Sequence, residues 1–195
     1  MITSRDRKII NFIDQYGFLT IDQAAKLFFG NFKTQYDIAR RRLKKILENG
    51  GYIRVFKNTE TNNMIYVPED SKLRKVSKHD LLVMDYISDL KTLGVEFEKI
   101  EIEKDFNGAI ADAFIIFKLG DYRYYHILEI QLRHDYVEIN RYNKHLNTIL
   151  NQTNNTLPKL IIVQNTNHNY SKENKTDMEI IQLDTSLSDI AKTVI

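Results

Sequence analysis

The spacing of apolar positions changes from helical to alternating early in the chain. Apolar side chains recur every three or four positions in three segments, and we predict helices over 4–16, 20–29 and 34–49. The second helix begins with a capping box, in which Thr20 and Gln23 satisfy backbone groups of the first turn. Alternation then predicts two strands, 52–57 and 64–67, joined by a polar loop. Three helices followed by a β-hairpin are typical of a winged helix.

The third predicted helix separates an apolar stripe from a basic face, as a helix crossing a DNA major groove requires. The stripe contains Tyr36, Ala39, Leu43, Ile46 and Leu47. At about 100° per residue, Arg41 and Lys45 lie opposite this stripe, Thr34 can cap the helix, and Arg40 lies nearer the core edge. The candidate DNA contacts, on this helix and at the hairpin tip, are Thr34, Gln35, Ile38, Arg41, Arg42, Lys44, Lys45, Lys57, Asn58, Asn62 and Asn63.

The second part of the chain predicts a different architecture. Residues 69–78 are polar, follow a proline and form a linker. Beyond them the pattern predicts helices over 79–91, 136–153 and 186–193, and strands over 96–103, 109–118, 123–132, 159–164 and 179–183. The order indicates an α/β domain with a mixed sheet that is covered on both sides. We therefore expect two domains, a winged helix over 1–68 and an α/β domain over 79–195.

Charge divides the chain in the same way. Residues 1–78 contain sixteen Lys and Arg against eight Asp and Glu, a net charge of +8, whereas residues 79–195 contain twelve against eighteen, a net charge of −6. A basic front part favours a polyanion as partner, most often nucleic acid. The chain has no cysteine, which excludes disulfides and thiolate metal sites. It also lacks a signal-peptide pattern and an apolar run near the roughly 20 residues of a membrane helix, so we expect a cytoplasmic protein with no membrane partner.

Two carboxylates stand in otherwise apolar strands of the second domain. Gly120-Asp121 is a favourable two-residue hairpin turn, and a turn centred there places Asp112 directly opposite Glu129 on one side of the sheet. Apolar residues share that side, so the pair is expected to be covered. A covered carboxylate pair needs a cation, a hydrogen-bond network or a raised pKa, and Mg²⁺ is one solution.

The chain resembles two related groups of proteins. The order helix–three strands–helix–strand, with an Asp in the second strand and Glu129-Ile130-Gln131 in the third, is similar to the PD-(D/E)XK nuclease superfamily. A second set of short motifs spans both predicted domains: Asp6-Arg7, LTIDQAAKLFF at 19–29, RRRLKKILENGGYI at 40–53, His79-Asp80-Leu81, Ala111-Asp112-Ala113, Leu128-Glu129-Ile130-Gln131 and Arg141-Tyr142. Through these motifs the whole chain resembles the replication-relaxation family of plasmids and mobile elements, which joins a winged helix to a domain of this kind.

The resemblance implies roles for individual residues. Asp112, Glu129 and the main-chain carbonyl of Ile130 would bind Mg²⁺, and Gln131 stands where the superfamily has its catalytic lysine. Glutamine has no positive charge for the developing transition state, which favours an inactive, nuclease-like domain. Lys144 or Arg141 in the following helix could replace the lost cation, although both point away from that helix's apolar stripe, toward solvent.

Three functions remain open from the sequence. The leading interpretation is a DNA-binding protein of a plasmid or mobile element. It would act on double-stranded DNA in replication or conjugative transfer, with replication or relaxase proteins as partners and a homodimer compatible with paired half-sites. The alternative is a Mg²⁺-dependent DNA endonuclease that its winged helix directs to the target. A third interpretation is a transcriptional regulator with a sensor domain, for which the sequence identifies no effector pocket.

Overall fold

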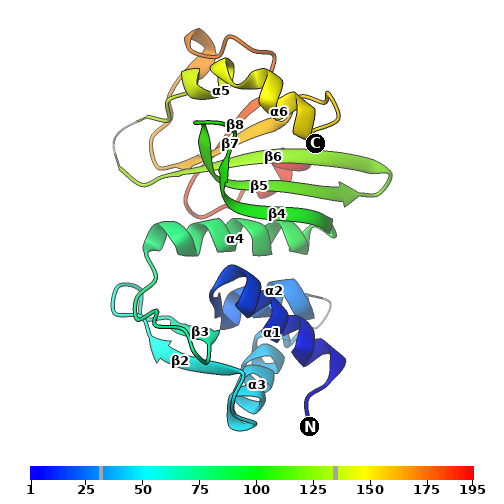
Figure 1. The fold of residues 1–195 in the computed structure, drawn as a ribbon, viewed down its shortest axis with the longest axis vertical. Coiled ribbons are helices and arrows are strands. Elements are labelled where there is room, and N and C mark those ends of the chain that lie inside the picture. The colour runs from blue at the N-terminus through cyan, green and yellow to red at the C-terminus, as the bar shows by residue number, and fades with distance from the viewer. Residues whose placement is uncertain (31–32, 134–135) are drawn as a thin grey trace. The chain divides into compact units, whose positions relative to one another are not determined.

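The structure, a computed structural model, describes residues 1–30, 33–133 and 136–195 and divides into two compact units (Figure 1). The first is Met1–Thr92 and the second Leu93–Ile195. The sequence places the linker at 69–78 and assigns the helix after it to the second domain, whereas the contacts of that helix place it in the first unit. Among the described residues, no helix is both long and apolar enough to cross a membrane.

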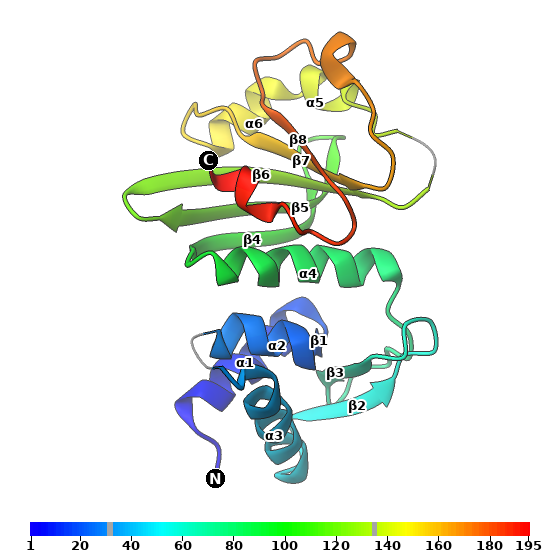
Figure 2. The same ribbon diagram turned by 180° about the vertical axis from the view of Figure 1, so that it is seen from behind.

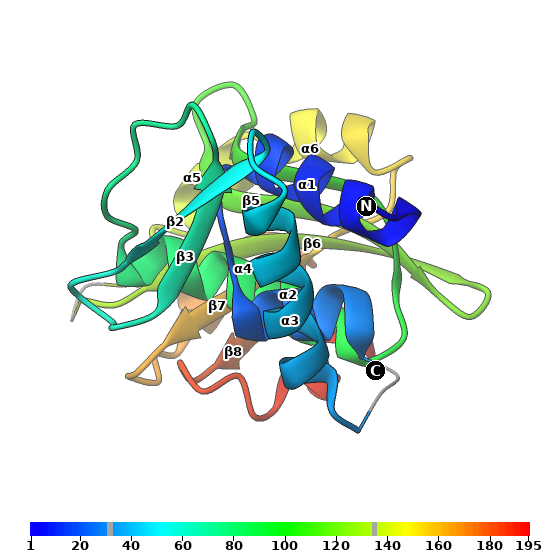
Figure 3. The same cartoon turned by 90° about the horizontal axis from the view of Figure 1, so that it is seen from below.

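The first unit combines helices with a small antiparallel sheet. Its elements are α1 (Ser4–Tyr16), β1 (Leu19–Thr20), α2 (Ile21–Phe29), α3 (Gln35–Glu48), β2 (Ile53–Lys57), β3 (Met64–Pro68) and α4 (Lys78–Thr92). The strands are ordered β1-β3-β2, so β3 is central. The predicted helices and both hairpin strands are confirmed within a residue or two; Figure 3 shows α3 and the hairpin from below. Strand β1 was not predicted, because two residues give no alternation to detect.

Local sequence signals account for the helix ends of this unit. Gly17 ends α1 with a φ of 85°, and its amide donates to the Ile13 carbonyl at 2.8 Å. The predicted capping box of α2 is confirmed, since Thr20 and Gln23 each bond the other's backbone amide. Thr34 precedes α3 at the expected position, but within the described residues its hydroxyl makes no capping hydrogen bond. The prediction that Thr34 caps α3 through its side chain is therefore wrong.

Helix α4 belongs to the first unit because α2 bonds to it. The Gln23 side-chain amide donates to the Leu81 carbonyl at 3.3 Å and to Asp85 Oδ1 at 2.8 Å. Lys26 forms an ion pair with Asp89 one helical turn further along. These bonds join residues about sixty positions apart, so a boundary placed by composition alone falls too early.

The second unit is built on a five-stranded mixed sheet. Its elements are β4 (Glu96–Asp105), β5 (Ile110–Leu119), β6 (Tyr122–Gln131), α5 (Asn140–Lys144), α6 (Leu146–Gln152), β7 (Lys159–Gln164), η1 (Tyr170–Lys172), β8 (Ile180–Leu183) and η2 (Ile190–Val194). The order is β4-β5-β6-β7-β8, antiparallel from β4 to β6 and parallel from β6 to β8. The predicted mixed α/β sheet is confirmed.

The helices of this unit differ from prediction. The segment 136–153, predicted as one helix, forms two short helices that separate at His145, and the predicted terminal helix is a 3₁₀ helix. Helices α5 and α6 pack on one face of the sheet through a core that includes Tyr142 and Ile149. The red C-terminal segment η2 lies against the other face (Figure 2), where the His126 ring bonds the Thr193 carbonyl and the Tyr124 hydroxyl donates to the Val194 carbonyl.

One arginine of the basic run in α3 belongs to the core of the first unit. Arg42 forms an ion pair with Asp6, which is 1% exposed, and its Nε donates to Asp6 Oδ1 at 2.9 Å. Burial raises the pKa of Asp6, but hydrogen bonds from Arg42 and Thr3 outweigh this and hold it below its ordinary value. The pair fixes α3 to the start of α1, so Arg42 has a structural role, and its assignment as a DNA contact stays a prediction.

Removing Arg42 should therefore destabilise the protein more than removing its neighbour. We expect Arg42→Ala to lower the free energy of unfolding by about 2 kcal/mol, since it leaves a buried carboxylate without its cation. The exposed Arg41 provides the matched control, and Arg41→Ala should change stability by less than about 0.5 kcal/mol. Urea unfolding of both variants measures the difference, and equal losses would contradict the structural role of Arg42.

Candidate functional site

The outer face of α3 carries an exposed group of cations. Ala39, Leu43 and Ile46 are buried and define the inner face. On the opposite side four basic residues are exposed: Arg40, Arg41, Lys44 and Lys45. Acidic neighbours on the same face lie 3.7 Å from Arg40 and from Lys44, and such exposed pairs are weak. This face can therefore offer its cations to a polyanion.

Three residues of α3 differ from prediction in their exposure. Tyr36, assigned to the apolar stripe, is 45% exposed, and Arg40, assigned to the core edge, is exposed as well. Ile38, assigned to the DNA side, packs partly against the core. Counting Tyr36 as a core residue displaced the expected centre of the stripe. The exposed Arg40 and Tyr36 are thus candidate contacts that the sequence analysis missed.

The hairpin tip is only partly available for binding. Asn58 is fully buried: its amide donates to the Val76 carbonyl at 2.9 Å and to Thr61 at 3.0 Å, and its oxygen accepts from the Val76 amide. It ties the hairpin loop to the segment before α4, so its assignment as a DNA contact is wrong. Lys57, Asn62 and Asn63 are exposed, as is Thr34, and Gln35 is half-buried.

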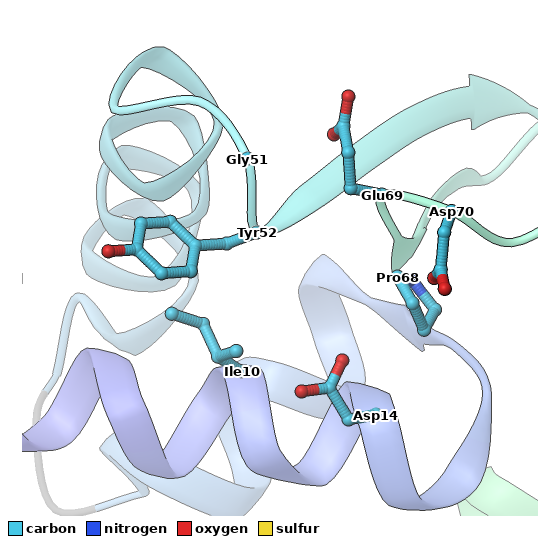
Figure 4. A pocket seen from close by; sticks show the side chains of 7 residues that line it. All are labelled: Ile10, Asp14, Gly51, Tyr52, Pro68, Glu69 and Asp70. Carbon is cyan, nitrogen blue, oxygen red and sulfur yellow. The ribbon is translucent and has the colours of Figure 1, made fainter.

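A cavity of about 650 Å³ in the first unit has an acidic lining, in contrast to the basic face of α3 (Figure 4). It is lined by Ile10, Asp14, Gly51, Tyr52, Pro68, Glu69 and Asp70. In Figure 4, Asp14 of α1 points toward the chain segment that carries the other two carboxylates. Three carboxylates repel phosphate, so this cavity does not belong to a nucleic-acid interface.

In the second unit, the β5–β6 hairpin has the predicted register. Leu119 pairs with Tyr122 around the turn, and the ladder continues to Ala113 and Leu128. Asp112 and Glu129 follow directly beyond this last pair. Strand alternation places both carboxylates on the face covered by α5 and α6, where Phe114 and Ile127, two positions away on each strand, join the core. The two carboxylates therefore share one face, as expected.

Glu129 is the buried member of the pair. It is 6% exposed, and its Oε1 accepts hydrogen bonds from the Tyr142 hydroxyl and from Arg141 Nη2, the latter at 2.5 Å. Burial raises the pKa of Glu129 to about 7; the Arg141 charge opposes this, and the Asp112 charge adds to it. Burial also raises the pKa of Tyr142 well above its ordinary value, so its hydroxyl remains a donor.

Asp112 has a partner on the neighbouring strand. Its Oδ2 accepts a hydrogen bond from the Ile130 amide at 2.6 Å, just where the β5–β6 ladder has ended. The carboxylate thus replaces a backbone acceptor for that amide. Gln131 is half-buried at the end of β6, and its Oε1 accepts from the Arg133 amide at 3.4 Å.

The two candidate replacement cations lie in different places. Arg141 was expected to point to solvent. Instead it turns inward to Glu129 and is half-buried. Lys144 is exposed and lines a separate cavity together with Glu138, Asn140, Asn143, Leu146, Lys175 and Thr176. The cation beside the carboxylates is therefore Arg141.

The arrangement does not fit a Mg²⁺ ion, which binds one or two carboxylates and keeps several waters. Glu129 Oε1 already accepts from a guanidinium and a phenol, which places a positive charge beside the pair, and Asp112 Oδ2 accepts from a backbone amide. Within residues 1–30, 33–133 and 136–195, no group of three or more His, Cys, Asp or Glu could hold a metal. These residues form a hydrogen-bonded ion cluster.

The raised pKa of Glu129 predicts a pH effect on stability. Its pKa is about 7 in the fold against 4.5 for an unperturbed glutamate, so the folded state holds the proton more tightly. The contribution of this group to stability therefore falls as pH rises from about 4.5 through about 7. Calorimetry should show the Tm of Glu129→Gln, a neutral near-isostere, declining less between about pH 5 and pH 8 than that of the wild type. If Tm falls equally with pH in the wild type and in Glu129→Gln, the raised pKa of Glu129 is contradicted.

The comparisons with known proteins give one distant likeness. No protein-family model and no curated protein matches the chain. Among solved structures, it is similar to the restriction endonuclease FokI bound to DNA, with 14% sequence identity and a TM-score of 0.31 over 94% of this chain. The chain spans 43% of the FokI chain. A likeness of this size carries no conclusion about fold or activity.

Proposed function

We propose that the protein binds double-stranded DNA through a winged helix formed by α1 to α3 and the β2–β3 hairpin. The observation that carries this proposal is the outer face of α3, along which Arg40, Arg41, Lys44 and Lys45 are exposed. The inner face of the same helix is anchored by Leu43 in the core. A recognition helix needs both properties, because it must be held rigidly and still reach phosphates and bases.

The net charges of the two units support the same proposal. Met1–Thr92 contains seventeen Lys and Arg against eleven Asp and Glu, a net charge of +6, and Leu93–Ile195 contains eleven against fifteen, a net charge of −4. Neutralising phosphates releases condensed counterions, and this drives binding. The first unit is therefore the one that the proposal assigns to DNA.

Within the proposed interface, different residues serve different purposes. The cations of α3 and Lys57 at the hairpin would contact phosphates, which position the protein without reading sequence. Tyr36, exposed in the first turn of α3, is a candidate for contact with base edges, because the N-terminal part of a recognition helix enters the groove. Asn62 and Asn63 at the hairpin tip offer amides that can bond backbone or bases.

The biological role is proposed from the resemblance described above. In a plasmid or mobile element, a protein of this kind would bind a replication or transfer site in the cytoplasm. Replication or relaxase proteins, or a second copy bound at a paired half-site, are the proposed partners. The second unit would act as a nuclease-like scaffold that does not cut DNA, since Gln131 supplies no charge and Arg141 occupies Glu129.

One observation favours a second candidate, a Mg²⁺-dependent DNA endonuclease. Arg141 lies beside the carboxylate pair, and if it left Glu129 to a metal ion it would supply the positive charge that Gln131 lacks. The two candidates share the DNA-binding unit and differ only in whether DNA is cut.

The DNA-binding proposal predicts that removing two cations of α3 weakens the affinity for DNA and its dependence on salt. For Arg41→Ala combined with Lys45→Ala, fluorescence anisotropy with a labelled duplex should show at least roughly tenfold weaker binding at low salt. The slope of log K against log salt should become shallower by about 1.8, because two phosphate contacts are lost.

The control removes the same charge from the other unit. Lys144→Ala combined with Lys175→Ala takes away two exposed cations of the second unit, and it should leave affinity and salt slope nearly unchanged. An equal or larger loss from this control pair would mean that the second unit holds the DNA.

A plasmid-nicking assay distinguishes the DNA-binding protein from the endonuclease. We expect supercoiled plasmid to stay intact with the wild-type protein in Mg²⁺ or Mn²⁺, at the level seen with Asp112→Ala. Nicking that the wild type shows and Asp112→Ala lacks would establish the endonuclease instead.

A further inference from the structure

The Asp112–Glu129 site of the second unit is built around one internal cation. Glu129 is 6% exposed, and a buried carboxylate is costly unless a positive charge and hydrogen bonds compensate it. Arg141 supplies the charge at 2.5 Å, and the Tyr142 hydroxyl supplies a second hydrogen bond to the same oxygen. The charge requirement of the site is thus met by the chain itself.

Arg141 is held in this position by its neighbour Tyr142. Its neighbour Tyr142 is fully buried in the core of the second unit, which fixes α5 above the strand ends. The Arg141 guanidinium carbon lies 5.1 Å from the centre of the Tyr142 ring, and its Nη2 lies 3.4 Å from the Tyr142 hydroxyl. A side chain held in this way is a fixed component of the site rather than a mobile surface arginine.

The same place is where a divalent ion would have to sit. An ion shared by the two carboxylates would have to lie beside Glu129, whose Oε1 already accepts from Arg141 and Tyr142. A second full positive charge beside the guanidinium would also be repelled by it. Arg141 and a metal ion are therefore alternatives for one position.

We propose that Arg141 is the permanent cation of the Asp112–Glu129 site, which excludes divalent metal from it, and that removing this side chain converts the site into one that binds metal. The liganding groups left behind would be the carboxylates of Asp112 and Glu129, both oxygen donors of the kind that Mg²⁺ and Mn²⁺ prefer. The inference concerns the second unit alone and does not depend on DNA binding.

The experiment measures Mn²⁺ binding to the full-length chain by electron paramagnetic resonance and by thermal shift. The wild type should have the same Tm in EDTA and in Mn²⁺ and should bind no Mn²⁺ up to about 1 mM, a concentration typical of weak sites. Arg141→Ala should have a lower Tm in EDTA. It should bind Mn²⁺ at least tenfold more tightly than the wild type, with a Tm that rises with Mn²⁺ concentration by mass action.

Matched variants locate the effect. Arg141→Lys keeps the cation and should behave like the wild type, and Lys144→Ala removes an exposed cation from the same helix and should do so too. Adding Asp112→Asn to Arg141→Ala should abolish the gained Mn²⁺ binding. If Arg141→Ala does not fold, Arg141→Gln, which retains hydrogen-bond donors without the charge, takes its place.

Two results would overturn the proposal. One is Mn²⁺ binding by the wild type that Asp112→Asn removes, which would show that metal and Arg141 coexist. The other is a folded Arg141→Ala or Arg141→Gln variant that gains no Mn²⁺ affinity. Neither result would alter the DNA-binding assay, so failure of this inference and failure of the proposed function can be told apart.

Discussion

A buried carboxylate is costly unless a positive charge or hydrogen bonds compensate it, and each unit of this protein compensates one with an arginine from a helix. In the first unit Arg42 of α3 pairs with Asp6, and in the second Arg141 of α5 pairs with Glu129. The first pair joins α3 to α1, 36 positions earlier, and the second joins α5 to β6, the strand that precedes it. The two pairs thus decide how α3 and α5 are rotated, and with that which side chains each helix presents outward.

This constraint separates structural from functional charges. Because Arg42 is committed to Asp6, the cations left on the outer face of α3 form one surface without a core role. Because Arg141 is committed to Glu129, the carboxylate pair of the second unit is already compensated. The proposed function follows from this separation: a basic unit that holds DNA, and an acidic unit whose nuclease-like site is closed by its own side chain.

Patterns that act over a few residues were readable from the sequence. The Gly120-Asp121 turn fixed the hairpin register, and with it the common face of Asp112 and Glu129. The orientation of a side chain was not predictable where its partner is distant in the sequence. Arg42 turns inward to a residue 36 positions earlier, and Asn58 is buried against Val76, 18 positions later. The periodicity of apolar residues also did not predict the break between α5 and α6 at His145, because the apolar spacing continues through it.

The most direct test of the division between the two units is hydrogen–deuterium exchange of the full chain with and without a DNA duplex. The account predicts slower exchange on DNA binding in residues 33–48 and 57–63, which include the outer face of α3 and the hairpin tip. Segments around Asp112, Glu129 and Arg141 should exchange at unchanged rates. Protection confined to the second unit, with the first unit unaffected, would contradict the account.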